Sequence, residues 1–299
     1  MSSALYIGDA LEWLRKAEGR SVQCCVTSPP YFRLRDYGHD KQLGMESTIN
    51  EYIANMVNIF SEVKRVLSDT GTLWLNIGDT YYGSGRGGNT GIKTGQSKDK
   101  SSHVKSLKGN GLMGIPWRLA LALQADGWIL RQDIIWHKPN PMPESVTNRC
   151  TKAHEYIFLF SKQPNYYFNK INEPVAKSTK GRMSQDIVRQ KGSYRVPGKT
   201  NGAMKAVGNG ITRNARSVWT IPVNKAKHAH FATFPEKLVE KCLMASLPKH
   251  GTVLDPFCGS GTVGVVAERM GNDSVLIDIN PEYIEIAKER VGNITASQL

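Results

Sequence analysis

The fold of this chain is decided by one stretch of its sequence, Asp255-Pro256-Phe257-Cys258-Gly259-Ser260-Gly261-Thr262. The stretch follows a short apolar run at 252–254 that is typical of a buried strand, and it precedes a segment that we expect to be helical up to Gly271. A glycine-rich connection of this kind lets a ligand approach the backbone closely. Units of strand, loop and helix predict an α/β fold, in which ligands bind at the carboxyl ends of mainly parallel strands.

Two acidic residues indicate which ligand this loop holds. The loop lacks the lysine of a phosphate-binding P-loop and the GxGxxG spacing of a dinucleotide site. It opens with Asp255 instead, which favours a ligand that carries an ammonium group. Asp278 ends the next predicted strand, where a carboxylate can accept hydrogen bonds from both hydroxyls of a ribose. The pair therefore predicts S-adenosylmethionine, a nucleoside with an ammonium-bearing tail, although Asp278 taken alone would fit equally well as a helix N-cap.

A second stretch, Thr27-Ser28-Pro29-Pro30-Tyr31, follows another apolar run at 22–26. Two consecutive prolines cannot continue a strand, so the chain must leave the sheet there. A hydroxyl, stiff carbonyl acceptors and an aromatic ring then lie together at a strand end. This set suits a flat polar ring that bears an amino group, with acceptors for its N–H atoms and Tyr31 to stack on its face. The alternative is a proline-rich turn with a tyrosine in the core.

Strands and helices alternate along the rest of the chain. Apolar runs predict strands at 4–7, 22–27, 72–77, 131–136, 155–160, 252–254 and 274–277. Helical spacing and end signals predict helices at 9–15, 51–67, 115–123, 235–247, 262–271 and 281–292. We expect Gly71 to end the second helix, and the proline-rich segment 137–143 to be irregular.

Polar residues close five of the predicted strands: Asp9, Ser28, Asp79, Asp255 and Asp278. Any one of them alone would serve as a helix cap. Because the carboxyl ends of parallel strands meet at one edge of a sheet, five together predict a site at that edge.

The charge of the chain is uneven. Its formal net charge is +13, and most of this lies in the segment 162–227, where 14 Lys and Arg face only Glu173 and Asp186. A shorter basic stretch at 83–111 is rich in glycine and serine, and we expect it to be a mobile loop, with an idle insertion as the alternative. Basic charge confined to two segments predicts a polyanionic partner. Neither segment has the amphipathic pattern that would favour a membrane surface.

Length and composition limit the remaining classes. A chain of 299 residues can form one large α/β domain with an insertion, or two modest domains. No apolar run is long enough to span a membrane, and the first residues lack the features of a secretory signal. The five cysteines lack CxxC spacing, so we expect reduced thiols, no metal site and a cytoplasmic protein.

The motifs at 255–262 and 27–31 together resemble those of the amino-group DNA methyltransferases, which act on adenine N6 or cytosine N4. The catalytic motif precedes the cofactor motif, as in the circularly permuted β group. The resemblance implies a class I S-adenosylmethionine-dependent methyltransferase, Rossmann-like, with seven strands in the spatial order 3-2-1-4-5-7-6. The chain would supply them as 3, 4, 5, 6, 7, then the basic segment, then 1 and 2. Residues 1–161 and 228–299 would form the catalytic and cofactor-binding halves of one domain, and 162–227 an inserted target-recognition segment.

The resemblance also implies roles for single residues. The catalytic loop would be Ser28, Pro29, Pro30 and Tyr31. The cofactor would be bound by residues from four segments: Asp9, Phe234, Pro235, Asp255, Phe257, Gly259, Gly261, Thr262 and Asp278. Ser28 departs from the more common Asp at its position. We therefore expect cytosine N4 as the target in preference to adenine N6, since a Ser there is associated more often with cytosine.

The chemistry agrees with these residues. The lone pair of an exocyclic amine is conjugated to its ring, and it is freed when acceptors pull the N–H atoms out of plane. Ser28 Oγ and the Pro29 carbonyl can be those acceptors while Tyr31 fixes the ring. Methylation at cytosine C5 would need a thiolate, typically in a Pro-Cys pair, and no such dipeptide occurs in the chain.

The expected partner is double-stranded DNA, from which the target base must leave the stack. Methylation of RNA or of protein amides, and DNA binding by an inactive fold, are the alternatives; the permuted order and the intact motifs argue against them. We expect a cytoplasmic enzyme, encoded by a bacterium or phage and associated with the nucleoid. Whether it forms a homodimer or accompanies a restriction endonuclease stays open.

Overall fold

A computed structural model describes residues 2–34, 39, 41–81, 111–175, 211–223, 235–292 and 294–296, and no side chain beyond 292. The chain forms two compact units. The main unit comprises Met1–Phe168 and Ser217–Leu299, and the second comprises Asn169–Arg216. The two segments expected to be the halves of one methyltransferase domain thus lie in the same unit.

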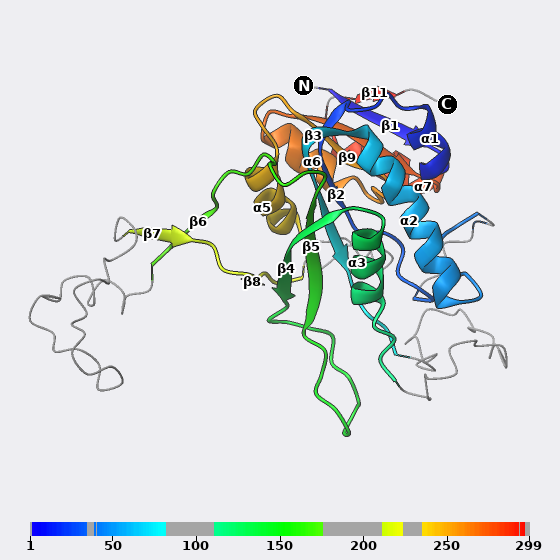
Figure 1. Ribbon diagram of the computed structural model, residues 1–299, viewed down its shortest axis with the longest axis vertical. Coiled ribbons are helices and arrows are strands. Elements are labelled where there is room, and N and C mark those ends of the chain that lie inside the picture. Colours follow the sequence, from blue (N-terminus) through cyan, green and yellow to red (C-terminus); the bar gives the residue numbers. More distant parts are fainter. Residues whose placement is uncertain are drawn as a thin grey trace, which may run out of the picture. The chain divides into compact units, whose positions relative to one another are not determined.

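The main unit is built on a nine-stranded sheet with the order β11-β1-β10-β9-β2-β3-β5-β4-β8 (Figure 1). The strands are β1 Ser3–Ile7, β2 Val22–Thr27, β3 Leu67–Ile77, β4 Ile129–His137, β5 His154–Ser161, β8 Val218–Thr220, β9 Thr252–Asp255, β10 Asp273–Asp278 and β11 Ile294–Ala296. Strand β5 is antiparallel to both of its neighbours, and the other pairs of neighbours are parallel.

This order confirms the expected class I methyltransferase fold and its permutation. From β1 to β4 the seven inner strands follow 3-2-1-4-5-7-6, since β9 and β10 come late in the chain but lie between β1 and β2. The short strands β11 and β8 extend the edges, so the described sheet has nine strands and not seven.

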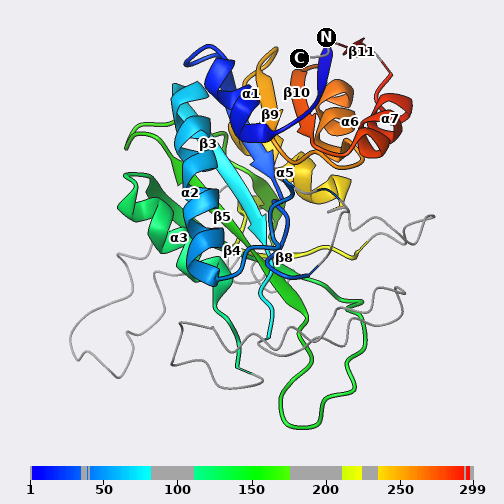
Figure 2. The ribbon, with the colours of Figure 1, turned by 90° about the vertical axis from the view of Figure 1, so that its right-hand side faces the viewer.

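Helices cover both faces of the sheet (Figure 2). One face carries α1 Ala10–Lys16, α2 Ile49–Val66 and α3 Ile115–Ala125, and the other carries α5 Glu236–Ser246, α6 Thr262–Arg269 and α7 Pro281–Arg290. Local signals set their starts: Thr48 and Glu51 form a capping box for α2, and Asn280 caps α7 ahead of Pro281. In the described part of the chain, no helix is long and apolar enough to cross a membrane.

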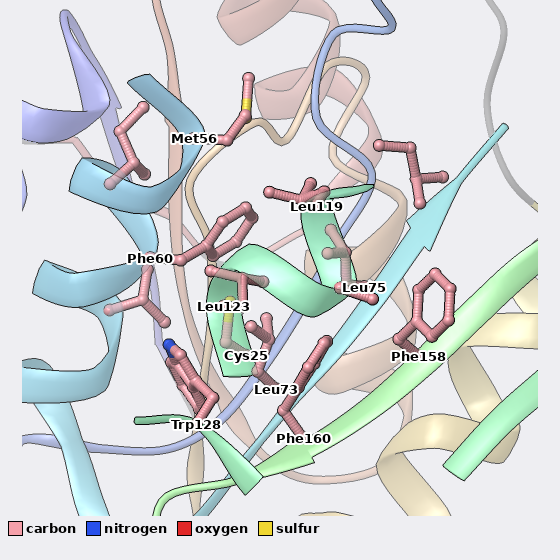
Figure 3. Packing of buried hydrophobic residues seen from close by; sticks show 14 of the residues in the cluster. Cys25, Met56, Phe60, Leu73, Leu75, Leu119, Leu123, Trp128, Phe158 and Phe160 are labelled. Carbon is pink, nitrogen blue, oxygen red and sulfur yellow. The ribbon is translucent and has the colours of Figure 1, made fainter. Parts of the chain in front are cut away.

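The main core lies between the sheet and helices α2 and α3 (Figure 3). Met56 and Phe60 of α2 and Leu119 and Leu123 of α3 face strand residues such as Phe158. Helical spacing places these apolar side chains on one side of each helix. The rigid sheet beneath them is what holds the loops at its carboxyl edge.

Gly71 does not end helix α2, contrary to expectation. The helix ends at Val66, and β3 begins at once with Leu67. Pairing with β2 then moves five residues along β3, from Leu67 to Thr72, for two along β2. This bulge folds the chain so tightly that a Cβ on Gly71 would lie 3.0 Å from the Ser68 carbonyl oxygen.

The second unit is narrower than the expected insertion 162–227. Strand β8 pairs with β4 in the main sheet, and its Trp219 is 4% exposed, with its ring centroid 6.0 Å from that of Trp74. Within the second unit, β6 Asn172–Pro174 pairs antiparallel with β7 Thr212–Asn214. The expected mobile loop, most of the basic segment and Phe234 lie outside the described residues.

The core predicts a graded response to truncation. We expect Phe158→Ala, a fully buried side chain, to lower the free energy of unfolding by about 3–5 kcal/mol. Leu121→Ala removes an apolar side chain that is 57% exposed on α3, and should cost less than about 0.5 kcal/mol. Urea unfolding of both variants measures the difference, and equal losses would contradict the described core.

Candidate cofactor and catalytic site

The polar strand ends do meet at one edge of the sheet. Strands β1, β10, β9, β2 and β3 are consecutive neighbours, and all five run parallel. Their carboxyl ends lead to Asp9, Asp278, Asp255, Ser28 and Asp79. The expectation of a shared edge is therefore confirmed, and the contacts of each residue distinguish its role.

Asp255 lies at the centre of this edge and is 1% exposed. Its Oδ1 accepts hydrogen bonds from Thr27 Oγ1 at 2.7 Å and from the Phe257 amide at 3.1 Å. Its Oδ2 is buried and has no hydrogen-bond partner among the described residues. Burial raises the pKa of Asp255 to about 7. A buried acceptor left without a donor fits a ligand that brings a positively charged donor, as an ammonium group does.

Asp278 holds the other side of the glycine loop. Its Oδ2 accepts from the Gly259 amide at 2.8 Å, and its Oδ1 accepts from the Asn280 amide at 2.9 Å. Burial raises its pKa, while these backbone bonds lower it. The N-cap of α7 is Asn280, whose side chain accepts from Glu282, so the N-cap alternative for Asp278 is wrong.

The two glycines of the loop differ in their surroundings. Gly259 has a φ of +49°, and a Cβ there would meet nothing within 4 Å. Gly261 has a φ of +76°, and a Cβ there would lie 2.8 Å from the Ala287 Cβ. Gly259 thus borders an open cradle, whereas Gly261 lets helix α6 begin close against α7. Thr262, the first residue of α6, is buried behind it.

Arg290, the last residue of α7, holds the glycine loop in place through hydrogen bonds. Its Nη1 donates to the Ser260 carbonyl at 2.6 Å and to the Ser260 hydroxyl at 2.7 Å, and lies 3.4 Å from Thr262 Oγ1. Sequence reasoning missed this residue, because a basic side chain in the last turn of a helix is an ordinary end signal.

The proline loop begins directly after β2. The Pro30 carbonyl accepts from the Tyr52 hydroxyl at 2.8 Å, and Tyr52 is fully buried on α2. Helix α2 therefore holds Pro30 in place. Tyr52 does not use the Pro29 carbonyl, which is the acceptor expected for the target amine. Ser28 is half-buried, and its hydroxyl lies 3.4 Å from the Tyr31 hydroxyl.

Tyr31 lies between the core and the strand end that carries Glu155. Its ring packs against the edge of the core, and its hydroxyl donates to Glu155 Oε2 at 2.8 Å. Burial, and then the charge of Glu155, raise the pKa of Tyr31 well above its usual value, so the phenol keeps its proton. Glu155 was not predicted from the sequence, because it lies more than a hundred residues from Tyr31.

The other expected site residues lie around this centre. Asp9 is the N-cap of α1, and Asp79 accepts from the Gly114 and Ile115 amides at the start of α3. Both acids thus stabilise helix ends. Pro235 is the N-cap of α5, and Phe257 is half-buried beside Asp255. Phe234 is outside the described residues.

Comparison with known proteins gives a consistent set of similarities. A protein-family model described as DNA methylase matches residues 22–289. The chain is 44% identical to the type II methyltransferase M.Cfr9I of Citrobacter freundii, over 97% of this chain and 87% of that protein. It is 41% identical to the type II methyltransferase M.SmaI of Serratia marcescens, over 97% of this chain and 91% of that protein.

Two solved structures share the fold at lower sequence identity. The cytosine-N4-specific PvuII DNA methyltransferase superposes with a TM-score of 0.65 at 20% identity, covering 99% of this chain and 89% of its own. The Thermus thermophilus protein TTHA0409, bound to S-adenosyl-L-methionine, superposes with a TM-score of 0.60 at 21% identity, covering 99% and 98%.

The raised pKa of Asp255 predicts a pH dependence of stability. The folded protein binds this proton more tightly than the unfolded chain does, so the stabilisation is complete below about pH 4 and is lost as the pH rises through about 7. A shift from 3.8 to about 7 corresponds to at most about 4 kcal/mol. We expect Asp255→Asn to remove this loss. Measured by urea unfolding, the free energy of unfolding of the variant should rise relative to that of the wild type between about pH 4.5 and pH 8. Parallel pH curves would show that Asp255 titrates normally.

Proposed function

We propose, from the premise that this chain belongs to the DNA methylase family, that it moves a methyl group from S-adenosylmethionine to an exocyclic amino group of a base in double-stranded DNA. The observation that carries the proposal is the hydrogen bond between Thr27 and Asp255. It joins the loop suited to an aromatic amine to the loop suited to a nucleoside with an ammonium tail.

The residues at the carboxyl edge fit the cofactor. Asp255 would hold its ammonium group through Oδ2, and this positive charge would favour the ionised form of the carboxyl group. Asp278 would accept from the ribose hydroxyls with the lone pairs that Gly259 and Asn280 do not use. The open side of Gly259 gives the ligand room near the backbone. When bound, the cofactor supplies an electrophilic methyl group on its sulfonium.

The proline loop would prepare the target amine. Ser28 Oγ and the Pro29 carbonyl would accept its two hydrogens and turn its lone pair out of conjugation. Tyr31, with its hydroxyl held by Glu155, would fix the plane of the base. No covalent bond between enzyme and base is needed, which agrees with the neutral, protonated state of Tyr31.

Double-stranded DNA is the proposed partner, and the target base would flip out of the helix to reach Ser28. The basic segment within 162–227 would choose the target sequence. In a bacterial or phage-infected cytoplasm, the enzyme would protect DNA as part of a restriction–modification system; a homodimer and a cognate endonuclease belong to the same proposal.

Cytosine N4 is the proposed target, with adenine N6 as the second candidate. The support for cytosine is Ser28, a neutral hydroxyl where an acid would attract the amino hydrogens more strongly. Both bases present an amine beside a ring nitrogen, so the mechanism is the same for either.

We expect DNA from cells that express the protein, in a host without its own methyltransferases, to contain N4-methylcytosine. Digestion to nucleosides and mass spectrometry measures it, and Ser28→Ala should lower the yield at least about tenfold. Methyladenine without N4-methylcytosine would contradict the choice of base. Neither product, with a folded protein present, would contradict the reaction.

Cofactor affinity tests the ribose acid separately. We expect Asp278→Asn to weaken binding of S-adenosylmethionine about tenfold in calorimetric titration without DNA, because charged acceptors make stronger hydrogen bonds. Asp273→Asn is the control, since Asp273 begins the same strand β10 at the opposite edge of the sheet. Equal affinities for the two variants would refute the assignment of Asp278.

A further inference from the structure

Four residues outside the motifs surround Tyr31, and we call them the tyrosine seat: Asn76, Gly78, Lys138 and Glu155. They come from three neighbouring strand ends, those of β3, β4 and β5. They bear on the reaction because Tyr31 lies between them and Ser28.

Glu155 is a fixed acceptor at the centre of the seat. Its Oε2 accepts from Tyr31 at 2.8 Å and from Asn76 Nδ2 at 3.2 Å, while its Oε1 pairs with Lys138 Nζ. The side chains of Glu155 and Lys138 are only 15% and 18% exposed, so solvent screens this pair little. Asn76 is fixed in turn, since it also donates to the Tyr156 carbonyl at 3.1 Å. Both carboxylate oxygens of Glu155 therefore have hydrogen-bond partners, and Lys138 balances the negative charge of the carboxylate.

The hydrogen bonds have a direction that extends to Ser28. A phenol has one proton, and Tyr31 lies 2.8 Å from Glu155 Oε2 but 3.4 Å from Asn76 Oδ1, so Glu155 receives it. The phenol oxygen is then an acceptor, and the Ser28 hydroxyl at 3.4 Å donates to it. With its proton turned to Tyr31, Ser28 keeps its lone pairs for another donor. An amine with two hydrogens is such a donor.

Gly78 seats the ring itself. A Cβ at this position would lie 2.7 Å from Tyr31 Cε2, closer than real Cβ atoms come. Gly78 is not among the glycines with positive φ, so its backbone suits alanine. Only the tyrosine ring, with the Glu155 carboxyl carbon 3.4 Å away, opposes a methyl group there. The ring is thus located by contact on one side and by its hydroxyl at the end.

We propose that Glu155 is a positioning residue for methyl transfer: held by Lys138 and Asn76, it fixes the Tyr31 hydroxyl so that Ser28 presents an acceptor to the target amine. The inference rests on the proposed function and deepens it. Glu155 touches neither substrate nor cofactor, and it acts through Tyr31.

The test is a double-mutant cycle on the rate of a single turnover with saturating enzyme, radiolabelled S-adenosylmethionine and substrate DNA. Tyr31→Phe keeps the ring and removes the hydroxyl. Glu155→Gln leaves one oxygen where the carboxylate has two, and Lys138 competes for it. We expect each variant to slow methyl transfer about tenfold, and the double variant to be no slower than the slower single one, because both break the same contact. Cofactor affinity should stay close to that of the wild type in each variant. The melting temperature should stay close to it in Tyr31→Phe, whereas Glu155→Gln should lower it because Lys138 loses its carboxylate partner.

Two matched controls separate position from general damage. Glu62→Gln removes the same charge from an ion pair with Arg65 on α2, and should leave the rate unchanged. Gly78→Ala should slow transfer about tenfold by displacing the ring, whereas Gly19→Ala should not, since a Cβ there would meet its nearest atoms at 3.6 Å.

Wild-type rates in Tyr31→Phe and Glu155→Gln would overturn the inference, as would multiplicative losses in the double variant. A fall in melting temperature without a fall in rate would assign Glu155 a structural role only, and would also overturn it. If Glu155→Gln does not fold, Tyr31→Phe and Gly78→Ala carry the test. If the wild-type enzyme methylates no DNA, the proposed function itself is wrong. The titration with S-adenosylmethionine tests the cofactor site independently of that result.

Discussion

The site depends on one buried hydrogen bond, from Thr27 Oγ1 to Asp255 Oδ1, between residues 228 positions apart in the chain. It forms because β2 and β9 pair in parallel, with Cys24 opposite Val253 and Cys25 opposite Leu254. The next residue after Thr27 is Ser28, so the proposed catalytic loop starts where the proposed cofactor loop starts. The same bond occupies one oxygen of Asp255 and leaves the other buried without a donor among the described residues, and this is the acceptor proposed for the ammonium group.

The antiparallel strand β5 supplies the second constraint. Because it runs against its neighbours, its amino end lies at the edge where the parallel strands have their carboxyl ends, and Tyr156 pairs with Ile77 there. Glu155 therefore reaches the edge from a strand that sequence reasoning treated only as part of the sheet. Strand β4, which runs antiparallel to β5, ends beside it with its carboxyl end and brings Lys138 to the carboxylate. A reversed strand thus contributes the beginning of its sequence to a site that is otherwise made of strand ends.

The sequence predicted local structure well, since it depends on neighbouring residues. Strand β2 and the start of helix α7 at Asn280 and Pro281 lie as expected, because apolar runs and capping residues act locally. The spatial order of the strands came from family resemblance alone. Gly71 was assigned wrongly, and strand β8 within the segment 162–227 was not predicted, because a bulge and an edge strand depend on partners elsewhere in the sheet. Glu155, Gly78 and Arg290 were missed for a related reason: each acts across a long stretch of chain, and none carries a distinctive local pattern.

The most direct test of this account is a crystal structure of the protein with S-adenosylhomocysteine, which lacks the reactive methyl group but keeps the ammonium tail and the ribose. The account predicts the ammonium group within hydrogen-bond distance of Asp255 Oδ2, and the ribose hydroxyls against the Asp278 carboxylate beside Gly259. A ligand bound elsewhere, with Asp255 Oδ2 still buried and unpaired, would contradict it.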